Sequence, residues 1–303
     1  MTTRMPAISL AAVAGRRAAT IEAAAEAERL GFSGIYGPSM GDCVALCQAI
    51  AMATNEISFG TTIHPIYLRH PSDLASTAAF IHEIGEGRFK LGIGVTHGPV
   101  HDRLGVTPGK PLSDTRGYVA AMRKTTAYGD LPPIVLATLR NKMLDLAVEI
   151  GDGAVWANAS LNHFPTSVER IGEDRLADGF FVANMIPTVI DPDREAGAAR
   201  NRATLQGYVR LPNYRNYWRE AGYGDEMDAI ETALAARDDE AVTAAMSDAW
   251  LSSATLYGSA QQVRDGVEAW FDAGCSTPIL VPSSTGGGQM KAIAEMFACF
   301  GDG

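Results

Sequence analysis

The stretch EISFGTTIHPIYLRHPSDLASTAAFIHEIGEGRFKLGIGV (56–95) has the clearest structural pattern in the chain. Its two apolar runs, 56–64 and 87–95, predict buried strands. Between them, residues 71–84 have the apolar spacing of a helix that begins at a proline. A helix that connects two buried strands is the unit from which parallel sheets are built.

The same alternation continues in both directions along the chain. Further strands are predicted at 6–11, 31–37, 132–138, 153–158, 179–187 and 277–283. Further helices are predicted at 16–30, 42–53, 114–128, 140–150, 161–176, 191–205 and 289–300. Eight apolar strands, each followed by a helix, indicate an α/β fold with a parallel sheet covered by helices.

Two arrangements of such a sheet compete, a closed barrel and an open doubly wound sheet. The open sheet carries a Gly-rich phosphate turn after its first strand, but ISLAAVAGRR (8–17) has no GxGxxG. We therefore expect a single (β/α)8 TIM-barrel domain over residues 1–303. Residues 207–257 depart from the repeat and predict a helical insertion, which a helix at 259–273 connects to the eighth strand.

Composition excludes several classes of protein. The 303 residues are 47% hydrophobic and 20% charged, with 25 basic and 35 acidic residues and a net charge of −10. Nothing approaches the ~20 consecutive apolar residues of a membrane span, and no basic stripe could neutralise nucleic-acid phosphates. We expect neither a membrane nor a nucleic acid as a partner.

The cysteines and the N-terminus bear on location. Cys43, Cys47, Cys275 and Cys299 form no CxxC pair, which is typical of reduced thiols in a cytoplasmic protein. The segment MPAISLAAVAG (5–15) imitates a short signal peptide, but it contains a proline and a serine, and two arginines follow it directly. We interpret it as a first strand that enters a loop, and we expect a cytoplasmic protein.

Histidines gather where a barrel would place its chemistry, after the third and fourth strands. They are His64, His70, His97 and His101. The spacer Gly98-Pro99-Val100 is expected to be non-helical, so His97 and His101 would not share a helix face as metal ligands do, and we expect no metal. No G-x-S-x-G elbow of a serine hydrolase occurs. His70 precedes a proline, and we expect it to fix the start of the helix at 71–84.

Three motifs in a fixed order resemble one family. The stretch 59–106 combines a G-T-T-I strand, an R-H-P helix start, a G-R-F strand and a G-I-G-V-T-H loop, as in the luciferase-like oxidoreductases. PPIVLATLRNKMLDLAVEIGDGAVWANAS (132–160) is similar to their fifth and sixth strands. QGYVRLPNYRNYWREAG (206–222) resembles the branch that uses the deazaflavin coenzyme F420, relatives of methylenetetrahydromethanopterin reductase.

The resemblance implies a barrel that holds a flavin or deazaflavin. It also implies a non-proline cis peptide in the third strand, at Thr62-Ile63. A tricyclic ring needs an apolar slot, a few polar partners and a phosphate site. Gly92 and Gly94 would let the fourth strand approach its neighbours closely. The expected coenzyme contacts are Thr61, Thr62, Ile63, Gly94, Val95, Thr96, Thr138, Leu139, Arg140, Asn141 and Lys142.

The phosphate site is where the chain departs from the family. Relatives commonly have Gly-Pro at the start of the fifth helix, whereas this chain has Leu139-Arg140-Asn141. We expect the first amides of that helix, with Arg140 and Lys142, to hold the phosphate. The alternative is the loop Ser283 to Gly288 after the eighth strand.

His97 is the first candidate for proton transfer, because imidazole titrates near neutrality; alternatively, it only hydrogen-bonds the coenzyme. Tyr36, His64 and Trp156 are expected to line the substrate pocket. The function expected is hydride transfer between F420 and a small organic metabolite, most simply reduction of a C=C, C=N or C=O bond. The alternatives are an FMN-dependent monooxygenase and a non-catalytic binding barrel. The resemblance implies a homodimer that pairs through the helices at 42–53 and 72–84.

Overall fold

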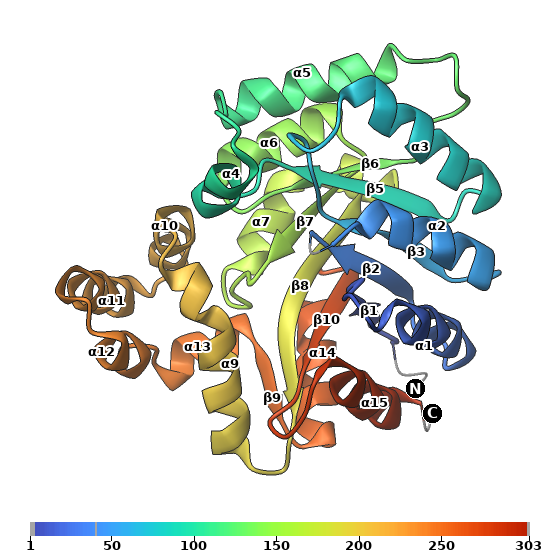
Figure 1. Cartoon of the computed structure of the whole chain (residues 1–303). Helices are drawn as coiled ribbons and strands as arrows, with labels where there is room; N and C mark the ends of the chain where they lie inside the picture. The colour runs from blue at the N-terminus through green and yellow to red at the C-terminus, as the bar shows by residue number, and fades with distance from the viewer. Residues whose placement is uncertain (1–3, 40, 302–303) are drawn as a thin grey trace.

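The computed structural model describes residues 4–39 and 41–301 (Figure 1). Its strands are β1 (Ala7–Ser9), β2 (Gly34–Pro38), β3 (Ser58–Thr62), β4 (His64–Pro65), β5 (Phe89–Gly94), β6 (Ile134–Ala137), β7 (Gly153–Ala157), β8 (Phe181–Ile190), β9 (Leu256–Gly258) and β10 (Thr277–Ser283). Neighbours run β10-β1-β2-β3-β5-β6-β7-β8, and β8 pairs with β10. This pairing closes a parallel barrel of eight strands, as predicted.

Helices follow the strands and form an outer layer around the barrel (Figure 1). They are α1 (Arg17–Arg29), α2 (Cys43–Ala53), α3 (Pro71–Ile84), α4 (Gly98–Leu104), α5 (Pro111–Arg123), α6 (Asn141–Ile150), α7 (Phe164–Ile171), α8 (Glu173–Ala177), α9 (Arg194–Val209), α10 (Pro212–Glu220), α11 (Gly224–Ala236), α12 (Asp239–Ala244), α13 (Asp248–Ala254), α14 (Ala260–Asp272) and α15 (Gln289–Phe300). Within the described ranges, none of them is long and apolar enough to cross a membrane.

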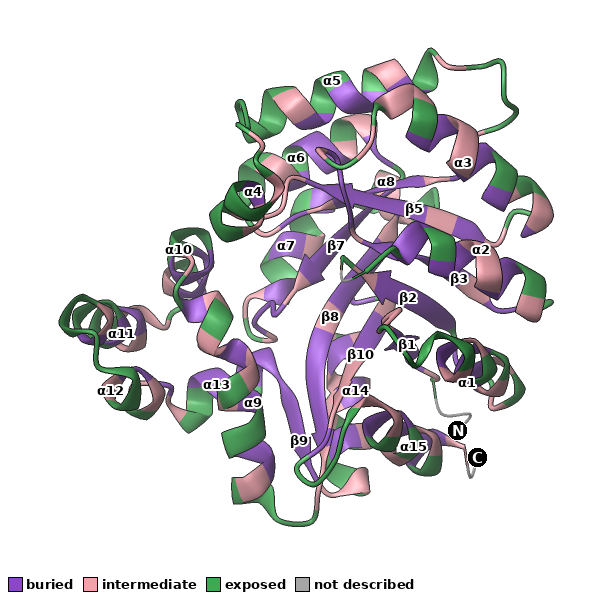
Figure 2. Ribbon diagram, viewed as in Figure 1, coloured by how far each residue is buried: buried purple, intermediate pink, exposed green. Residues whose placement is uncertain are grey.

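Alternation along the strands separates two buried layers. One set of strand residues meets inside the barrel: Ala7, Tyr36, Val135, Val155, Ala183 and Ile279. The intervening residues, such as Ile8, Ile35, Leu136 and Ile186, pack outward against the helices. The strands are accordingly buried along nearly their whole length, whereas the helices are exposed on their outer faces (Figure 2).

Several predicted helices differ from those observed. The helix predicted at 161–176 is interrupted at Gly172, whose φ of 86° ends α7. The segment after His97 was expected to be non-helical but forms α4, because proline is tolerated in the first turn of a helix. His70 caps α3 as expected, since its ring accepts the N–H of Ser72 at 3.3 Å.

The insertion is helical as predicted, with one strand that was not foreseen. α10 to α13 lie within 207–257, and β9 follows them. β9 pairs in parallel with the end of β8, where Leu256, Tyr257 and Gly258 lie opposite Thr188, Val189 and Ile190. The inserted segment therefore begins after β8 and ends in a strand that pairs with β8.

β3 and β5 approach each other unusually closely at the point where the barrel opens. A Cβ atom at Gly92 would lie 2.0 Å from the carbonyl oxygen of Thr61. At Gly94 it would lie 2.7 Å from the Cβ of Ala137 and 3.2 Å from Cδ1 of Ile63. The predicted cis peptide at Thr62-Ile63 is present, and β4 continues the strand beyond it. The two glycines thus leave room for the side chain of Ile63 inside the barrel.

Candidate active site

We call the open end of the barrel at the carboxyl ends of the strands the mouth. In barrels of this kind the reactive groups lie there, on the strand ends and the following loops. Thr96, after β5, has φ of 57°, and Asn158, after β7, has φ of 58°. Left-handed backbone is rare for a β-branched residue and tends to be kept at functional sites. Both residues lie at the edge of the mouth, which we call the rim.

Buried polar atoms without partners gather at this rim. Among the described residues, Oγ1 of Thr96, Oγ1 of Thr138 and Nδ2 of Asn158 make no hydrogen bond. The same holds for Oγ of Ser160 and Nε2 of His64. A buried polar group normally has a partner, because leaving it unpaired costs about 1–3 kcal/mol. Five such atoms follow β3, β5, β6 and β7, which is the arrangement expected where a polar ligand binds.

His97 occupies the entry to α4. It is the N-cap residue, but its side chain makes no cap hydrogen bond. Its ring lies edge-on to that of Tyr214, with 5.5 Å between the centroids. Burial, and after it the charge of His101, lowers the pKa of His97, so the imidazole is neutral at pH 7 and can accept a proton.

His101 lies inside α4 and is buried. Its Nε2 is hydrogen-bonded to the carbonyl oxygen of Val95, and its ring lies edge-on to Tyr67. Among the described residues, no three His, Cys, Asp or Glu side chains come together as metal ligands would.

His64 lies on β4 and is 4% exposed. Its Nδ1 is 3.9 Å from Sγ of Cys43, and its Nε2 has no partner among the described residues. Burial lowers the pKa of His64 to about 4, and the nearby Arg69 contributes to the shift. His64 is therefore a neutral, polar side chain beside Ile63.

The residues expected to form a wall behind the coenzyme, 61–63, lie at the end of β3 and directly after it. Thr61 donates through Oγ1 to the carbonyl oxygen of Gly92 at 2.6 Å, and Thr62 donates to that of Gly37 at 3.5 Å. The side chain of Ile63 packs against the residues inside the barrel. Thr61 and Thr62 hold the strand in position, whereas Ile63 supplies an apolar surface. Val95 is half-buried beside them, at the end of β5.

α10 lies at the edge of the mouth next to α4, a position that the sequence did not indicate (Figure 1). Trp218 donates through its indole N–H to the carbonyl oxygen of Asn158 at 3.2 Å. The hydroxyl of Tyr217 accepts the backbone N–H of Ser160 at 3.0 Å. Two hydrogen bonds thus fasten α10 to the loop after β7.

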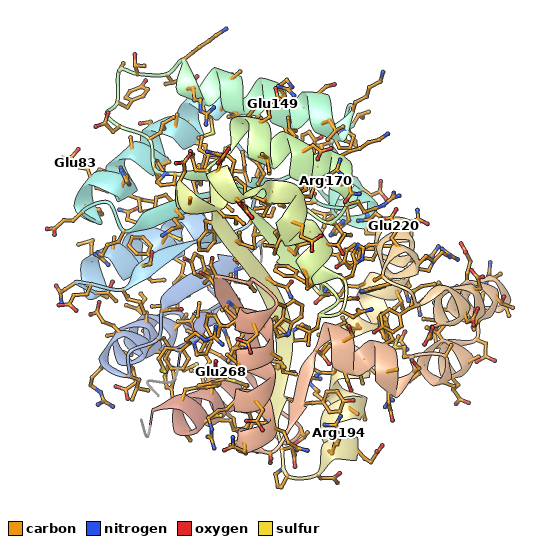
Figure 3. All side chains as sticks on the ribbon, turned by 180° about the vertical axis from the view of Figure 1, so that it is seen from behind. Glu83, Glu149, Arg170, Arg194, Glu220 and Glu268 are labelled. Carbon is orange, nitrogen blue, oxygen red and sulfur yellow. The ribbon has the colours of Figure 1, made fainter. Side chains whose placement is uncertain are left out.

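A third contact fastens α10 to the loop after β6. Nε of Arg140 donates to Oε1 of Glu220 at 2.9 Å, and the two side chains form an ion pair. Figure 3 shows Glu220 where α10 meets the barrel helices. Arg140, predicted to hold a phosphate, is thus already engaged by a carboxylate.

The rest of the expected phosphate site is open. Among the described residues, the N-cap side chain of α6, Arg140, makes no cap hydrogen bond, which leaves the first amides of the helix available to a ligand. Asn141 and Lys142 are exposed there, and Leu139 is half-buried against the core. In the alternative loop after β10, the hydroxyl of Ser283 accepts from Arg200 and that of Ser284 donates to Glu295, at 2.7 and 3.0 Å.

Two side chains expected in the substrate pocket lie elsewhere. Trp156 is 1% exposed and packs edge-on against Phe164 of α7, because alternation along β7 directs Val155 into the barrel and Trp156 outward. Tyr36 does point into the barrel, but its ring packs against Phe181 at the start of β8, with 5.5 Å between centroids. Neither ring reaches the mouth.

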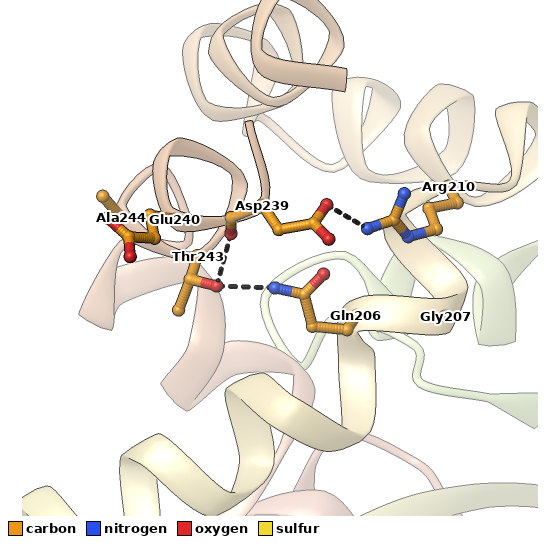
Figure 4. Close-up of a pocket in the computed structure, with 7 residues that line it drawn as sticks. All are labelled: Gln206, Gly207, Arg210, Asp239, Glu240, Thr243 and Ala244. Carbon is orange, nitrogen blue, oxygen red and sulfur yellow. Dashed lines mark hydrogen bonds and ion pairs between the residues drawn. The ribbon is translucent and has the colours of Figure 1, made fainter. Parts of the chain in front are cut away.

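Two cavities lie away from the mouth. One, of about 720 Å³, lies between α9 and α12, where Gln206 donates to Thr243 and Arg210 pairs with Asp239 (Figure 4). The other, of about 610 Å³, lies at the amino ends of β5 to β8. Within the part of the chain that the structure describes, His97, the apolar wall and the unpaired polar atoms come together at the mouth.

The chain is similar to known proteins along most of its length. The chain is 26% identical to a 5,10-methylenetetrahydromethanopterin reductase from Methanolobus tindarius, over 88% of this chain and 90% of the relative. Its fold is similar to that of the coenzyme F420-dependent tetrahydromethanopterin reductase from Methanopyrus kandleri, with a TM-score of 0.74, 18% identity and 97% of each chain covered. An F420-dependent secondary alcohol dehydrogenase, solved with an F420-acetone adduct, has a TM-score of 0.69, 17% identity and the same coverage.

A family model matches this chain along most of its sequence. The model of the luciferase-like monooxygenases matches residues 3–277, which include every barrel strand up to the start of β10. The cis peptide before β4 and the glycine-lined approach of β3 to β5 lie within this match. The chain belongs to the luciferase-like monooxygenase family.

Proposed function

We propose that the chain is an oxidoreductase that exchanges a hydride between the deazaflavin coenzyme F420 and a small organic metabolite. The proposal rests on one observation above all: an apolar wall at Ile63, over Gly92 and Gly94, faces a rim of buried polar atoms without partners. The names of the relatives and of the two similar structures support F420 as the coenzyme. Reduction of a C=C, C=N or C=O bond is the reaction we propose.

The residues present suit a deazaflavin. A flat tricyclic ring needs an apolar surface on one face and polar partners at its pyrimidine edge. Ile63 supplies the surface, and the hydroxyls of Thr96 and Thr138 with the amide of Asn158 supply partners. The uncapped N-terminus of α6 and the exposed Lys142 suit a phosphate.

When bound, the deazaflavin supplies or takes up a hydride at its C5 atom. The task left to the chain is to orient the two reactants and to move one proton. We assign the proton to His97, since its lowered pKa leaves the ring nitrogen free to accept from an alcohol at neutral pH. In the reducing direction the same nitrogen, once protonated, would donate to the substrate oxygen or nitrogen, or to the second carbon of a C=C bond. Tyr214 fixes the ring by its edge-on contact.

Coenzyme titration of the purified protein tests the proposal. We expect F420 to bind with a change in its fluorescence and FMN to bind at least 10-fold more weakly. FMN binding in preference to F420 would favour the alternative of a luciferase-like monooxygenase, which the family name keeps open. Binding of neither would favour a barrel without catalytic function.

A single variant links the binding to the mouth. Thr138→Val removes a buried hydroxyl that has no partner among the described residues and keeps the side-chain shape. The free protein should therefore be as stable as wild type or more so, whereas F420 should bind about 3- to 10-fold more weakly, the value of one hydrogen bond. Thr125→Val is the matched control, because Oγ1 of Thr125 bonds to Ala121 at the end of α5, far from the mouth. Equal affinity of the two variants for F420 would indicate that the deazaflavin ring does not bind beside Thr138.

A further inference from the structure

The cavity at the opposite end of the barrel from the mouth has features of a second binding site. Most of its lining residues lie at or just before the amino ends of strands: Gly87 and Lys90 at β5, 131–134 at β6, Asp152 before β7 and 178–181 at β8. His82 of α3, Arg123 of α5 and Arg175 of α8 complete the lining. The cavity is therefore distinct from the site proposed above. Its volume of about 610 Å³ is in the range of metabolite sites.

Lys90 is the most unusual of the lining residues. It lies on β5 and is half-buried, whereas Lys110, Lys124, Lys142 and Lys291, the other lysines, are exposed. Its ammonium donates to Oγ of Ser58 at 2.7 Å and lies 5.4 Å from the ring centre of Phe181. Burial lowers the pKa of Lys90. An ammonium has three donors, and within the described chain Lys90 has one acceptor and no ion pair.

Two further side chains at the cavity, Arg175 and His82, have a buried nitrogen without a partner among the described residues. Arg175 donates to the carbonyl oxygen of Gly151 at 2.7 Å and lies over the ring of Phe180, but its buried Nε has no partner among the described residues. The buried Nδ1 of His82 has none either, and it donates or accepts depending on the tautomer. Buried charges and donors are normally paired, so Lys90 and Arg175 have donors that lack an acceptor among the described residues.

The carboxylates at the cavity do not supply that acceptor. Asp152 accepts the N–H of Ile134 at 2.8 Å and lies 3.9 Å from Arg123, and Asp178 is exposed. Beside the basic groups, the lining is apolar, with Leu131, Pro132, Pro133 and Phe181. The lining thus combines excess positive charge with an apolar wall.

We infer that this cavity binds a small organic carboxylate, whose charged group meets Lys90 and Arg175 and whose apolar body lies against Pro132, Pro133 and Phe181. A carboxylate would fill the open donor positions of both side chains through charge-assisted hydrogen bonds. The apolar wall selects such a ligand over an inorganic anion.

Calorimetric titration of the coenzyme-free protein tests this with three probes: benzoate, the neutral analogue benzamide and inorganic phosphate. Benzoate should bind at least 10-fold more tightly than the other two. Lys90→Met keeps the length of the side chain and removes its charge, and it should weaken benzoate at least 10-fold. Lys124→Met is the matched control at an exposed lysine and should leave benzoate binding unchanged.

A second measurement does not depend on the folding of a variant. In wild-type protein, acetylation by acetic anhydride followed by peptide mass spectrometry should show Lys90 protected at least 5-fold by benzoate, with the four exposed lysines unaffected. Equal binding of benzoate and benzamide, tighter binding of phosphate, or unprotected Lys90 would overturn the inference. Because no probe or readout involves F420, failure here is distinguishable from failure of the proposed coenzyme.

Discussion

Gly92→Ala is the substitution for which the structure gives the sharpest expectation. An added Cβ would lie 2.0 Å from the carbonyl oxygen of Thr61, whereas Cβ atoms essentially never come within 3.0 Å of a non-bonded heavy atom. β3 or β5 must therefore shift by at least 1.0 Å, although Thr61 and Gly92 are hydrogen-bonded to each other. Overpacking of this kind costs about 3 kcal/mol.

Thermal unfolding with a matched glycine measures this cost. Taking an unfolding entropy of about 2.1 cal/mol/K per residue over 303 residues, a loss of about 3 kcal/mol lowers Tm by about 5 °C. Gly117→Ala is the control: Gly117 is exposed within α5, with no atom within 4 Å of an added Cβ, and the change should raise stability by about 0.5–1 kcal/mol.

The two substitutions are chemically identical and should have opposite signs. Gly92→Ala should in addition weaken F420 at least 10-fold, because the shift moves Ile63, whose Cγ2 would lie 3.4 Å from the added Cβ. Tm values of the two variants within 1 °C of each other would refute the reasoning about the closeness of β3 and β5.

Four other predictions follow from the site and the surface. His97→Ala should lower kcat roughly 100-fold with little change in coenzyme affinity, and the reverse pattern in steady-state kinetics and titration would make His97 a binding residue. Arg140→Ala should weaken F420 binding by at most about 10-fold (~1.4 kcal/mol), whereas Glu220→Gln should tighten F420 binding by freeing the guanidinium of Arg140. Unchanged F420 affinity in both variants would indicate that the phosphate binds at the loop after β10. We expect a homodimer, since Phe80 on α3 is 49% exposed. Light scattering should give a mass of about twice 32.1 kDa for wild type and a lower mass for Phe80→Glu, and a monomeric wild type would contradict this expectation. Because the pKa of His64 in the folded protein lies below the ordinary value of 6.5, its contribution to stability is present above pH 6.5 and is lost as the pH falls toward about 4. In denaturant titrations, His64→Gln should reduce that loss by roughly 2–3 kcal/mol. A pH profile of stability identical to that of wild type would contradict the assignment.

The strands and the closed barrel were predictable because buried parallel strands leave a strong local pattern. The glycines of G-I-G at 92–94 likewise indicated where two strands come close. α4 was missed because Pro99 was interpreted as a helix breaker, although proline is acceptable in a first turn. The outward direction of Trp156 was available from the parity of β7, since Val155 points inward.

Other parts of the site could not be predicted from local pattern. Arg140 and Glu220 are 80 residues apart, and nothing around either one specifies the contact. Asn158 did carry a signal, because asparagine at a strand end tolerates the left-handed backbone observed there. Its unpaired amide, however, depends on where Trp218 and Tyr217 of α10 dock, and that is a property of tertiary packing.

The return of β9 to the end of β8 has a consequence for how such enzymes diversify. Both ends of the segment from α9 to α13 are anchored on one strand, so its helices can lengthen, shorten or be exchanged without altering the order in which the barrel closes. That segment also carries α10, which lies at the edge of the mouth, whereas Ile63, Thr96 and Thr138 belong to an earlier part of the chain. Under the proposed function, the helices beside the mouth can therefore evolve while the strands and loops that carry Ile63, Thr96 and Thr138 stay fixed.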